Sequence, residues 1–227
     1  LVTRELAAEA FRRNIRIGVS IDGTRDVHDH HRRLAGGKPS FDRMMDGMQN
    51  LREAGFGTKH GIISVFTRYS LPYLEEILEF FAVDLKIDRF KMNIVKDSPV
   101  MKDKDLCLDN GEIADYQVRL VKKLVELNRR GYSIVELNIL DKIQNLLTRN
   151  KSNICISRGC MGGKKMIAID QEGRIFPCDI TDYKEEAVGS VHDGKDLVEL
   201  LEKAHNKSDF FNEKSSERCK NCPWCFY

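Results

Sequence analysis

The chain has 227 residues, of which 41% are hydrophobic, and this is enough to bury the core of one large domain, or of a domain with an appendage. Lysine and arginine total 37 against 35 acidic residues, so the charge balance gives no reason to expect a nucleic acid or an anionic membrane as a partner. No stretch approaches ~20 uninterrupted apolar residues and the start lacks the order of a secretory signal, so we expect a cytoplasmic protein without a membrane partner.

The N-terminal half alternates short β-branched runs with segments whose apolar residues recur every three or four positions, which predicts strands followed by helices. The expected strands are Asn14–Ile21, Lys59–Thr67 and Arg89–Val95, and the expected helices are Ser40–Ala54, Pro72–Ala82 and Glu112–Arg129. Ser40 is the expected N-cap of the first helix, and Gly55 follows its end. Successive β/α units predict a parallel sheet, and ligands bind at the carboxyl edge of such sheets. That edge holds Ser20 to Gly23, Thr67 and Asn93 to Lys96.

The number of expected strands bears on the extent of the protein. Three strands are too few to close a barrel, and the chain begins with Leu1 rather than methionine. We therefore expect partner strands to lie N-terminal to this chain in a longer protein.

From Ile154 the pattern changes to short apolar runs. Met166–Ile169 and Arg174–Phe176 flank an Asp-Gln-Glu-Gly turn, and together they predict a β-hairpin whose second strand leads to Cys178. A further helix is expected at Lys195–Ala204.

Six of the seven cysteines lie beyond residue 154, and in a cytoplasmic chain such a group indicates metal or redox ligands rather than disulfides. The flanks of the hairpin hold Cys155, Cys160 and Cys178, and the C-terminal C-x2-C-x2-C run holds Cys219, Cys222 and Cys225. On spacing alone, iron–sulfur clusters, a zinc ion and reduced structural thiols all stay open. The isolated Cys107 is expected to be incidental.

Three histidines, His28, His30 and His31, lie close together in the loop after the first expected strand. Their spacing does not place them on one helix face, so we do not expect them to be metal ligands. The pair His28 and Asp29 is expected to form a cap or turn feature.

Two groups of residues resemble radical S-adenosylmethionine (AdoMet) enzymes that carry a SPASM extension. The first is the segment GVSIDG at Gly18–Gly23, and it is followed by His28, Asp29, Arg32, Gly37, Ser40 and Phe41. The second is Cys160, Gly173 and Cys178, with twelve and four residues between them, and then Cys219 and Cys222. In that family a cysteine pattern C-x2-C-x5-C closes the second group, and its last cysteine would come directly after Tyr227. The resemblance extends from about Asn14 to the end of the chain.

This resemblance implies an α/β fold. Residues 1–150 would form the C-terminal half of a partial (β/α)6 barrel with its last three β/α units, and residues 151–227 a small cysteine-rich SPASM domain with a β-hairpin, truncated at its C-terminus. The family's C-x3-C-x2-C motif, which binds the radical-generating cluster, is absent from the chain, as is its Gly-Gly-Glu segment. We therefore expect this chain alone to be inactive.

The resemblance also implies roles for individual residues near AdoMet. Ser20 and Arg32 match positions that contact the AdoMet carboxylate. Asp22 would orient the turn or a ribose hydroxyl, and Asn93 or the neighbouring Ile94 would lie near the nucleoside.

In the cysteine-rich part, the resemblance assigns Cys155, Cys160 and Cys178 to a first auxiliary [4Fe–4S] cluster, with a fourth ligand beyond Tyr227. It assigns Cys219 and Cys222 to a second cluster. Cys225 departs from the pattern and stays open as an alternative ligand, a redox thiol or a spectator. Asp179 matches the general base proposed for sulfatase-maturating relatives, and its alternative role is to bond neighbouring backbone amides.

The resemblance implies that the full-length enzyme generates a 5′-deoxyadenosyl radical from AdoMet and removes hydrogen from a peptide or protein substrate. A flavodoxin or ferredoxin would donate electrons. We expect a maturase of a ribosomally made peptide that forms, for example, a thioether or side-chain crosslink. One alternative is an anaerobic sulfatase-maturating enzyme that forms formylglycine. The other is a non-catalytic zinc- or cluster-binding module that recognises a peptide.

Overall fold

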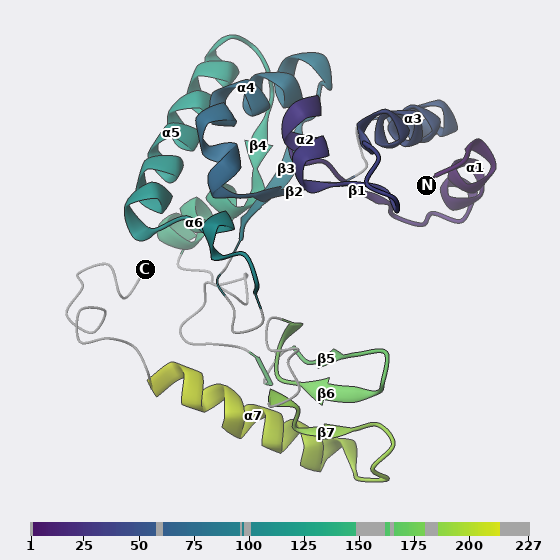
Figure 1. Ribbon diagram of the computed structural model, residues 1–227, viewed down its shortest axis with the longest axis vertical. Coiled ribbons are helices and arrows are strands. Elements are labelled where there is room, and N and C mark those ends of the chain that lie inside the picture. The colour runs from purple at the N-terminus through teal and green to yellow at the C-terminus, as the bar shows by residue number, and fades with distance from the viewer. Residues whose placement is uncertain are drawn as a thin grey trace. The chain divides into compact units, whose positions relative to one another are not determined.

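The computed structural model describes residues 2–57, 61–95, 97, 101–148, 162–163, 166–179 and 186–213. Its contacts divide the chain into two compact units, Leu1–Leu140 and Asp141–Tyr227, and Figure 1 shows the elements of both. Within the described ranges, no helix is both long enough and apolar enough to span a bilayer.

The first unit is built on a sheet of four parallel strands whose order in space is their order in the chain (Figure 1). The strands are β1 (Gly18–Ser20), β2 (Gly61–Phe66), β3 (Arg89–Ile94) and β4 (Val135–Glu136). Parallel neighbours need a crossover connection, and helices fill these connections here. The helices are α1 (Arg4–Arg12), α2 (Arg25–His31), α3 (Phe41–Leu51), α4 (Leu74–Glu79), α5 (Asn110–Arg129) and α6 (Leu137–Thr148), the last of which continues into the second unit. The α/β fold with a parallel sheet is therefore confirmed.

The structure also corrects several expected elements. α1 and α2 were not expected, and the strand expected from Asn14 begins only at Gly18, because Asn14 lies at φ 54° directly after α1. A fourth parallel strand, β4, joins the three that were expected, and α6 follows it. A strand of two residues is too short to show a period of two in its sequence, so the apolar pattern did not indicate it.

The two faces of the sheet differ in burial. On β2, Ile62, Ser64 and Phe66 are buried, and their side of the sheet packs against the helices in one apolar core. α4 and α5 lie side by side (Figure 1), and ion pairs join them, with Arg119 Nη2 at 2.6 Å from Glu75 Oε2. The opposite side, which we call the open face, carries Ser20, Ile63 and Asn93, all of them exposed.

The second unit contains the expected hairpin. β5 (Ala168–Ile169) and β6 (Arg174–Phe176) pair antiparallel, and β7 (Gly189–Ser190), which was not expected, pairs with β6. The Asp170 carboxylate accepts the N–H groups of Glu172 and Arg174 at 2.9 Å each, and Gly173 supplies the positive φ of 76° that the turn needs. α7 (Leu197–Glu213) follows and extends beyond the expected helix.

Candidate functional site

The segment after β1 places a buried carboxylate at the carboxyl edge of the sheet. Asp22 is only 2% exposed, and its Oδ1 accepts the N–H of Val65 in β2 at 2.8 Å. The next residue, Gly23, lies at φ 151°, and a Cβ there would come within 2.9 Å of the Ile77 side chain. The Asp-Gly pair therefore combines a polar link between β1 and β2 with a close approach to α4, which explains why the short turn has this sequence.

Arg32 pairs with this carboxylate. Its Nε donates to Asp22 Oδ2 at 2.6 Å and its Nη2 donates to Asp22 Oδ1 at 3.2 Å, and 35% of the Arg32 side chain is exposed. No other group in the described part of the chain accepts from this guanidinium. The Nη1 amine and the second N–H of Nη2 therefore remain available as a second fork of donors, which is suited to a carboxylate.

His28 lies between the Asp22 backbone and Ser40. The Asp22 N–H points to His28 Nδ1 at 3.4 Å, and His28 Nε2 is 3.1 Å from Ser40 Oγ. Because Nδ1 accepts a hydrogen bond, the proton of the neutral ring lies on Nε2, which donates to the serine hydroxyl. That hydroxyl in turn donates to the carbonyl oxygen of Arg32 at 2.6 Å.

Asp29 caps the helix that follows. Its Oδ1 accepts the N–H groups of Ser40 and Phe41 at 2.7 and 2.8 Å, so it satisfies free donors at the start of α3. Ser40 occupies the N-cap position as expected, but its side chain makes no capping bond because its hydroxyl is directed to Arg32. The expected cap or turn feature is confirmed for Asp29, whereas His28 lies within α2 and contacts the Asp22 N–H and the Ser40 hydroxyl.

The end of β2 carries a second polar group. Thr67 is 3% exposed, and its Oγ1 is 2.9 Å from His31 Nε2. Next to this contact the His30 ring stacks on Tyr69, with centroids 3.7 Å apart and planes 4° apart. The sequence pattern indicated Thr67 as an edge residue but not its pairing with His31, which depends on how α2 folds back toward β2.

The two hydrogen-bonded histidines of α2, His28 and His31, make the stability of the fold depend on pH. Burial is the main cause that lowers the pKa of both His28 and His31, and the neighbouring His30 lowers the pKa of His31 further. The unfolded chain therefore binds protons at a higher pH than the folded chain does. Their contribution to stability is present above the ordinary histidine pKa of ~6.5 and is lost as the pH falls through and below that value.

We expect the free energy of unfolding to decrease as the pH falls from about 7 to about 5.5, and the substitution His28→Gln to make this dependence shallower. Chemical denaturation of both proteins at several pH values measures the two slopes. Equal slopes would contradict the assignment of this effect to His28.

The residues expected near AdoMet lie toward the carboxyl ends of β1 and β3, and Arg32 contacts Asp22 there. Asp22 bonds to Val65, and Val65 is paired in register with Asn93 on β3. Ser20 lies on β1, paired with Ile63, on the open face. Asp22 is buried, and both of its carboxylate oxygens accept hydrogen bonds, from Arg32 and from Val65. Of the two roles expected for Asp22, orienting the turn therefore suits these contacts better than binding a ribose hydroxyl.

In the second unit, Cys178 follows β6 and is buried. Its Sγ donates to Oδ1 of the exposed Asp179 at 3.1 Å, so a thiol and a carboxylate lie together at the end of the hairpin. The other expected ligands, Cys155, Cys160, Cys219, Cys222 and Cys225, lie outside the described residues. Cys107, in the first unit, donates from Sγ to Met101 Sδ at 3.4 Å.

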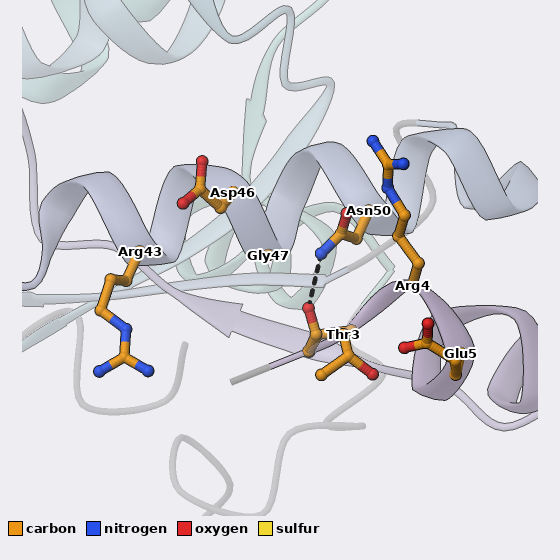
Figure 2. Close-up of a pocket in the computed structure, with 8 residues that line it drawn as sticks. Thr3, Arg4, Glu5, Arg43, Asp46, Gly47 and Asn50 are labelled. Atoms are coloured by element: carbon orange, nitrogen blue, oxygen red, sulfur yellow. Dashed lines mark hydrogen bonds between the residues drawn. The ribbon is translucent and has the colours of Figure 1, made fainter.

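A cavity of about 400 Å³ lies between α1 and α3 (Figure 2). Arg4, Glu5, Arg43 and Asp46 line it, and Asn50 Nδ2 donates to the carbonyl of Val2 at 2.9 Å. Its charges are mixed and exposed, and none of the residues expected from the sequence to bind a ligand lies in it.

Comparison with known proteins adds independent information on both units. Residues 160–223 match the family SPASM, an iron–sulfur cluster-binding domain. Over 218 residues the chain is 26% identical to a cysteine-type anaerobic sulfatase-maturating enzyme of Clostridium novyi, covering 93% of this chain and 55% of that protein. It is 23% identical to a serine-type anaerobic sulfatase-maturating enzyme of Bacteroides thetaiotaomicron, covering 96% of this chain and 55% of that protein. The chain thus spans about half the length of these curated relatives.

Solved structures share the fold. Histidine-tagged anSMEcpe with bound AdoMet superposes with a TM-score of 0.83 at 19% identity, covering all of this chain and 58% of that one. Native anSMEcpe with bound AdoMet and the Cp18Cys peptide gives the same TM-score at 18% identity, covering 62% of that chain. The matched cysteine-rich domain, the relatives and the shared fold thus show that this chain is similar to radical SAM/SPASM maturases.

Proposed function

We propose that the chain is part of a radical SAM/SPASM enzyme that binds AdoMet at the carboxyl edge of its parallel sheet and modifies a side chain of a peptide or protein. The observation that carries this proposal is the second fork of donors on Arg32, which Asp22 orients from the opposite edge of the guanidinium. An α-carboxylate is the group that such a fork binds bidentately. Ser20 and Asn93, exposed on the open face, offer further polar contacts to the rest of AdoMet.

AdoMet, together with a [4Fe–4S] cluster, supplies when bound the radical that removes a hydrogen atom from the substrate. The residues of this chain bind and orient. Cys178 suits an auxiliary cluster because its thiol is buried and follows a hairpin fixed by the Asp170 turn. With it, Cys155 and Cys160 would bind the first auxiliary cluster, and Cys219 and Cys222 a second, while Cys225 stays an alternative ligand.

The substrate class has two candidates within this proposal. A ribosomally made peptide that receives a thioether or other crosslink is the first. Conversion of a serine or cysteine side chain to formylglycine on a sulfatase is the second, and it is favoured by the similarity to sulfatase-maturating enzymes over more than 90% of the chain. The carboxylate of Asp179 beside Cys178 supports either candidate, because one-electron oxidation of the substrate radical releases a proton that a base can accept. We also infer a cytoplasmic enzyme that draws electrons from a flavodoxin or ferredoxin.

The full-length enzyme, purified without oxygen, tests this proposal. We expect it to contain iron and sulfide, and to release 5′-deoxyadenosine when it is given AdoMet and a reductant. Incubation with a peptide bearing a sulfatase serine or cysteine site, followed by hydrazine trapping, reports an aldehyde. Mass spectrometry of a precursor peptide encoded beside the gene reports a crosslink. Zinc in place of iron and sulfide would contradict the proposal and support the non-catalytic peptide-recognition module.

A further inference from the structure

The contacts around Arg32 form a closed ring that begins and ends at Asp22. The Asp22 carboxylate holds the Arg32 guanidinium, and the Asp22 N–H points to His28 Nδ1. His28 Nε2 contacts the Ser40 hydroxyl, and that hydroxyl donates to the Arg32 carbonyl at 2.6 Å. Both ends of Arg32, its side chain and its backbone, are therefore attached to the same residue of the sheet edge.

The Arg32 carbonyl depends on this ring because α2 ends there. The Arg32 N–H still donates to the carbonyl of His28 at 2.8 Å, as in a helix, but Arg32 itself is extended, with φ −109° and ψ 98°. Its own carbonyl thus has no helical partner, and the Ser40 hydroxyl takes that place. This contact holds the backbone at Arg32, from which the side chain extends to Asp22.

Two members of the ring are buried, while Ser40 and Arg32 are partly exposed. His28 is 1% exposed and Asp22 is 2% exposed, and in such surroundings an unmet polar group costs more than it does in water. The backbone of Ser40 is held separately by Asp29. The Ser40 hydroxyl is therefore not needed to start α3 and is free to orient Arg32.

We propose that His28 and Ser40 are positioning residues for Arg32, which they hold so that its second fork faces the carboxylate of AdoMet. This inference rests on the proposed function, in which Arg32 binds that carboxylate. His28 and Ser40 do not themselves touch AdoMet in this scheme. Their effect on AdoMet passes through Arg32.

Equilibrium binding of AdoMet to the anaerobic full-length enzyme tests the inference. Ser40→Ala should weaken binding about three- to tenfold, as expected for the loss of one neutral hydrogen bond, and Ser40→Thr, which keeps the hydroxyl, should restore most of it. Ser64→Ala is the matched control, because Ser64 is buried in the same sheet but its Oγ has no partner among the described residues. It should leave binding unchanged, and thermal unfolding should show that all three variants are folded.

A double-mutant cycle separates this inference from the function on which it rests. If Ser40 acts through Arg32, Ser40→Ala should weaken binding in the wild type but have little effect in an Arg32→Lys background. The same loss in both backgrounds, or no loss in either, would overturn the positioning role. If Arg32→Lys alone leaves AdoMet binding unchanged, the proposed role of Arg32 fails and the inference fails with it. A loss with Arg32→Lys but none with Ser40→Ala refutes the inference only.

Discussion

Replacing Arg32 by lysine is expected to weaken AdoMet binding by about ten- to hundredfold, since hydrogen bonds to charged groups contribute ~1.5–3 kcal/mol. The charge is kept, so the loss comes from geometry. The guanidinium contacts Asp22 with one edge and has donors left on the other, whereas an ammonium group is a point charge without a fork. A lysine paired with the buried Asp22 would have no second edge to present to a carboxylate.

The measurement is equilibrium binding of AdoMet to the reconstituted full-length enzyme. Arg33→Lys is the matched control, because Arg33 is the next residue, is exposed and donates from Nη1 to the carbonyl of Gly37 at 3.1 Å. It should bind AdoMet as the wild type does. An Arg32→Lys enzyme with unchanged affinity would refute the assignment of Arg32 to the carboxylate.

The parallel sheet was predictable because its main strands are long enough to show their pattern. β2 and β3 each have six residues, and each is followed by an apolar helical segment. α2 was not predictable in this way. Its sequence, Arg-Asp-Val-His-Asp-His-His, buries only Val27 and His28, so no apolar stripe marks it. It is held in place by tertiary contacts such as the one between His31 and Thr67.

The candidate site was only partly predictable, for a similar reason. The resemblance indicated Asp22 and Arg32 separately, as residues near AdoMet. That Asp22 holds Arg32 depends on the fold of the loop between β1 and α3, in which residues ten apart in the chain meet. A serine at the N-cap usually accepts from the free amides of its helix, but here Asp29 accepts them and the Ser40 hydroxyl donates to Arg32. No local sequence rule specifies which of two polar side chains reaches the free amides.

The substitution Asp179→Asn is expected to lower the rate of peptide modification by about 10²- to 10⁴-fold, the usual contribution of a general base. Asparagine keeps the shape of the side chain but cannot take up a proton. AdoMet affinity should not change, because none of the contacts that we propose for AdoMet involves Asp179. Product formation and AdoMet binding in the same preparation give the two readouts.

Iron content distinguishes the two roles of Asp179. In the described residues its carboxylate accepts from the Cys178 thiol at 3.1 Å, a proton that cysteine loses when it becomes a cluster ligand. If Asp179 only supports the fold around Cys178, Asp179→Asn should lower the iron and sulfide content together with the rate. If it is the base, the rate should fall at unchanged iron content.

Asp193→Asn is a suitable control, because Asp193 Oδ2 accepts the N–H of Ser190 in the β7 turn rather than the Cys178 thiol. If the Asp179→Asn enzyme turns over as fast as the wild type, Asp179 is not the general base and another group accepts the proton.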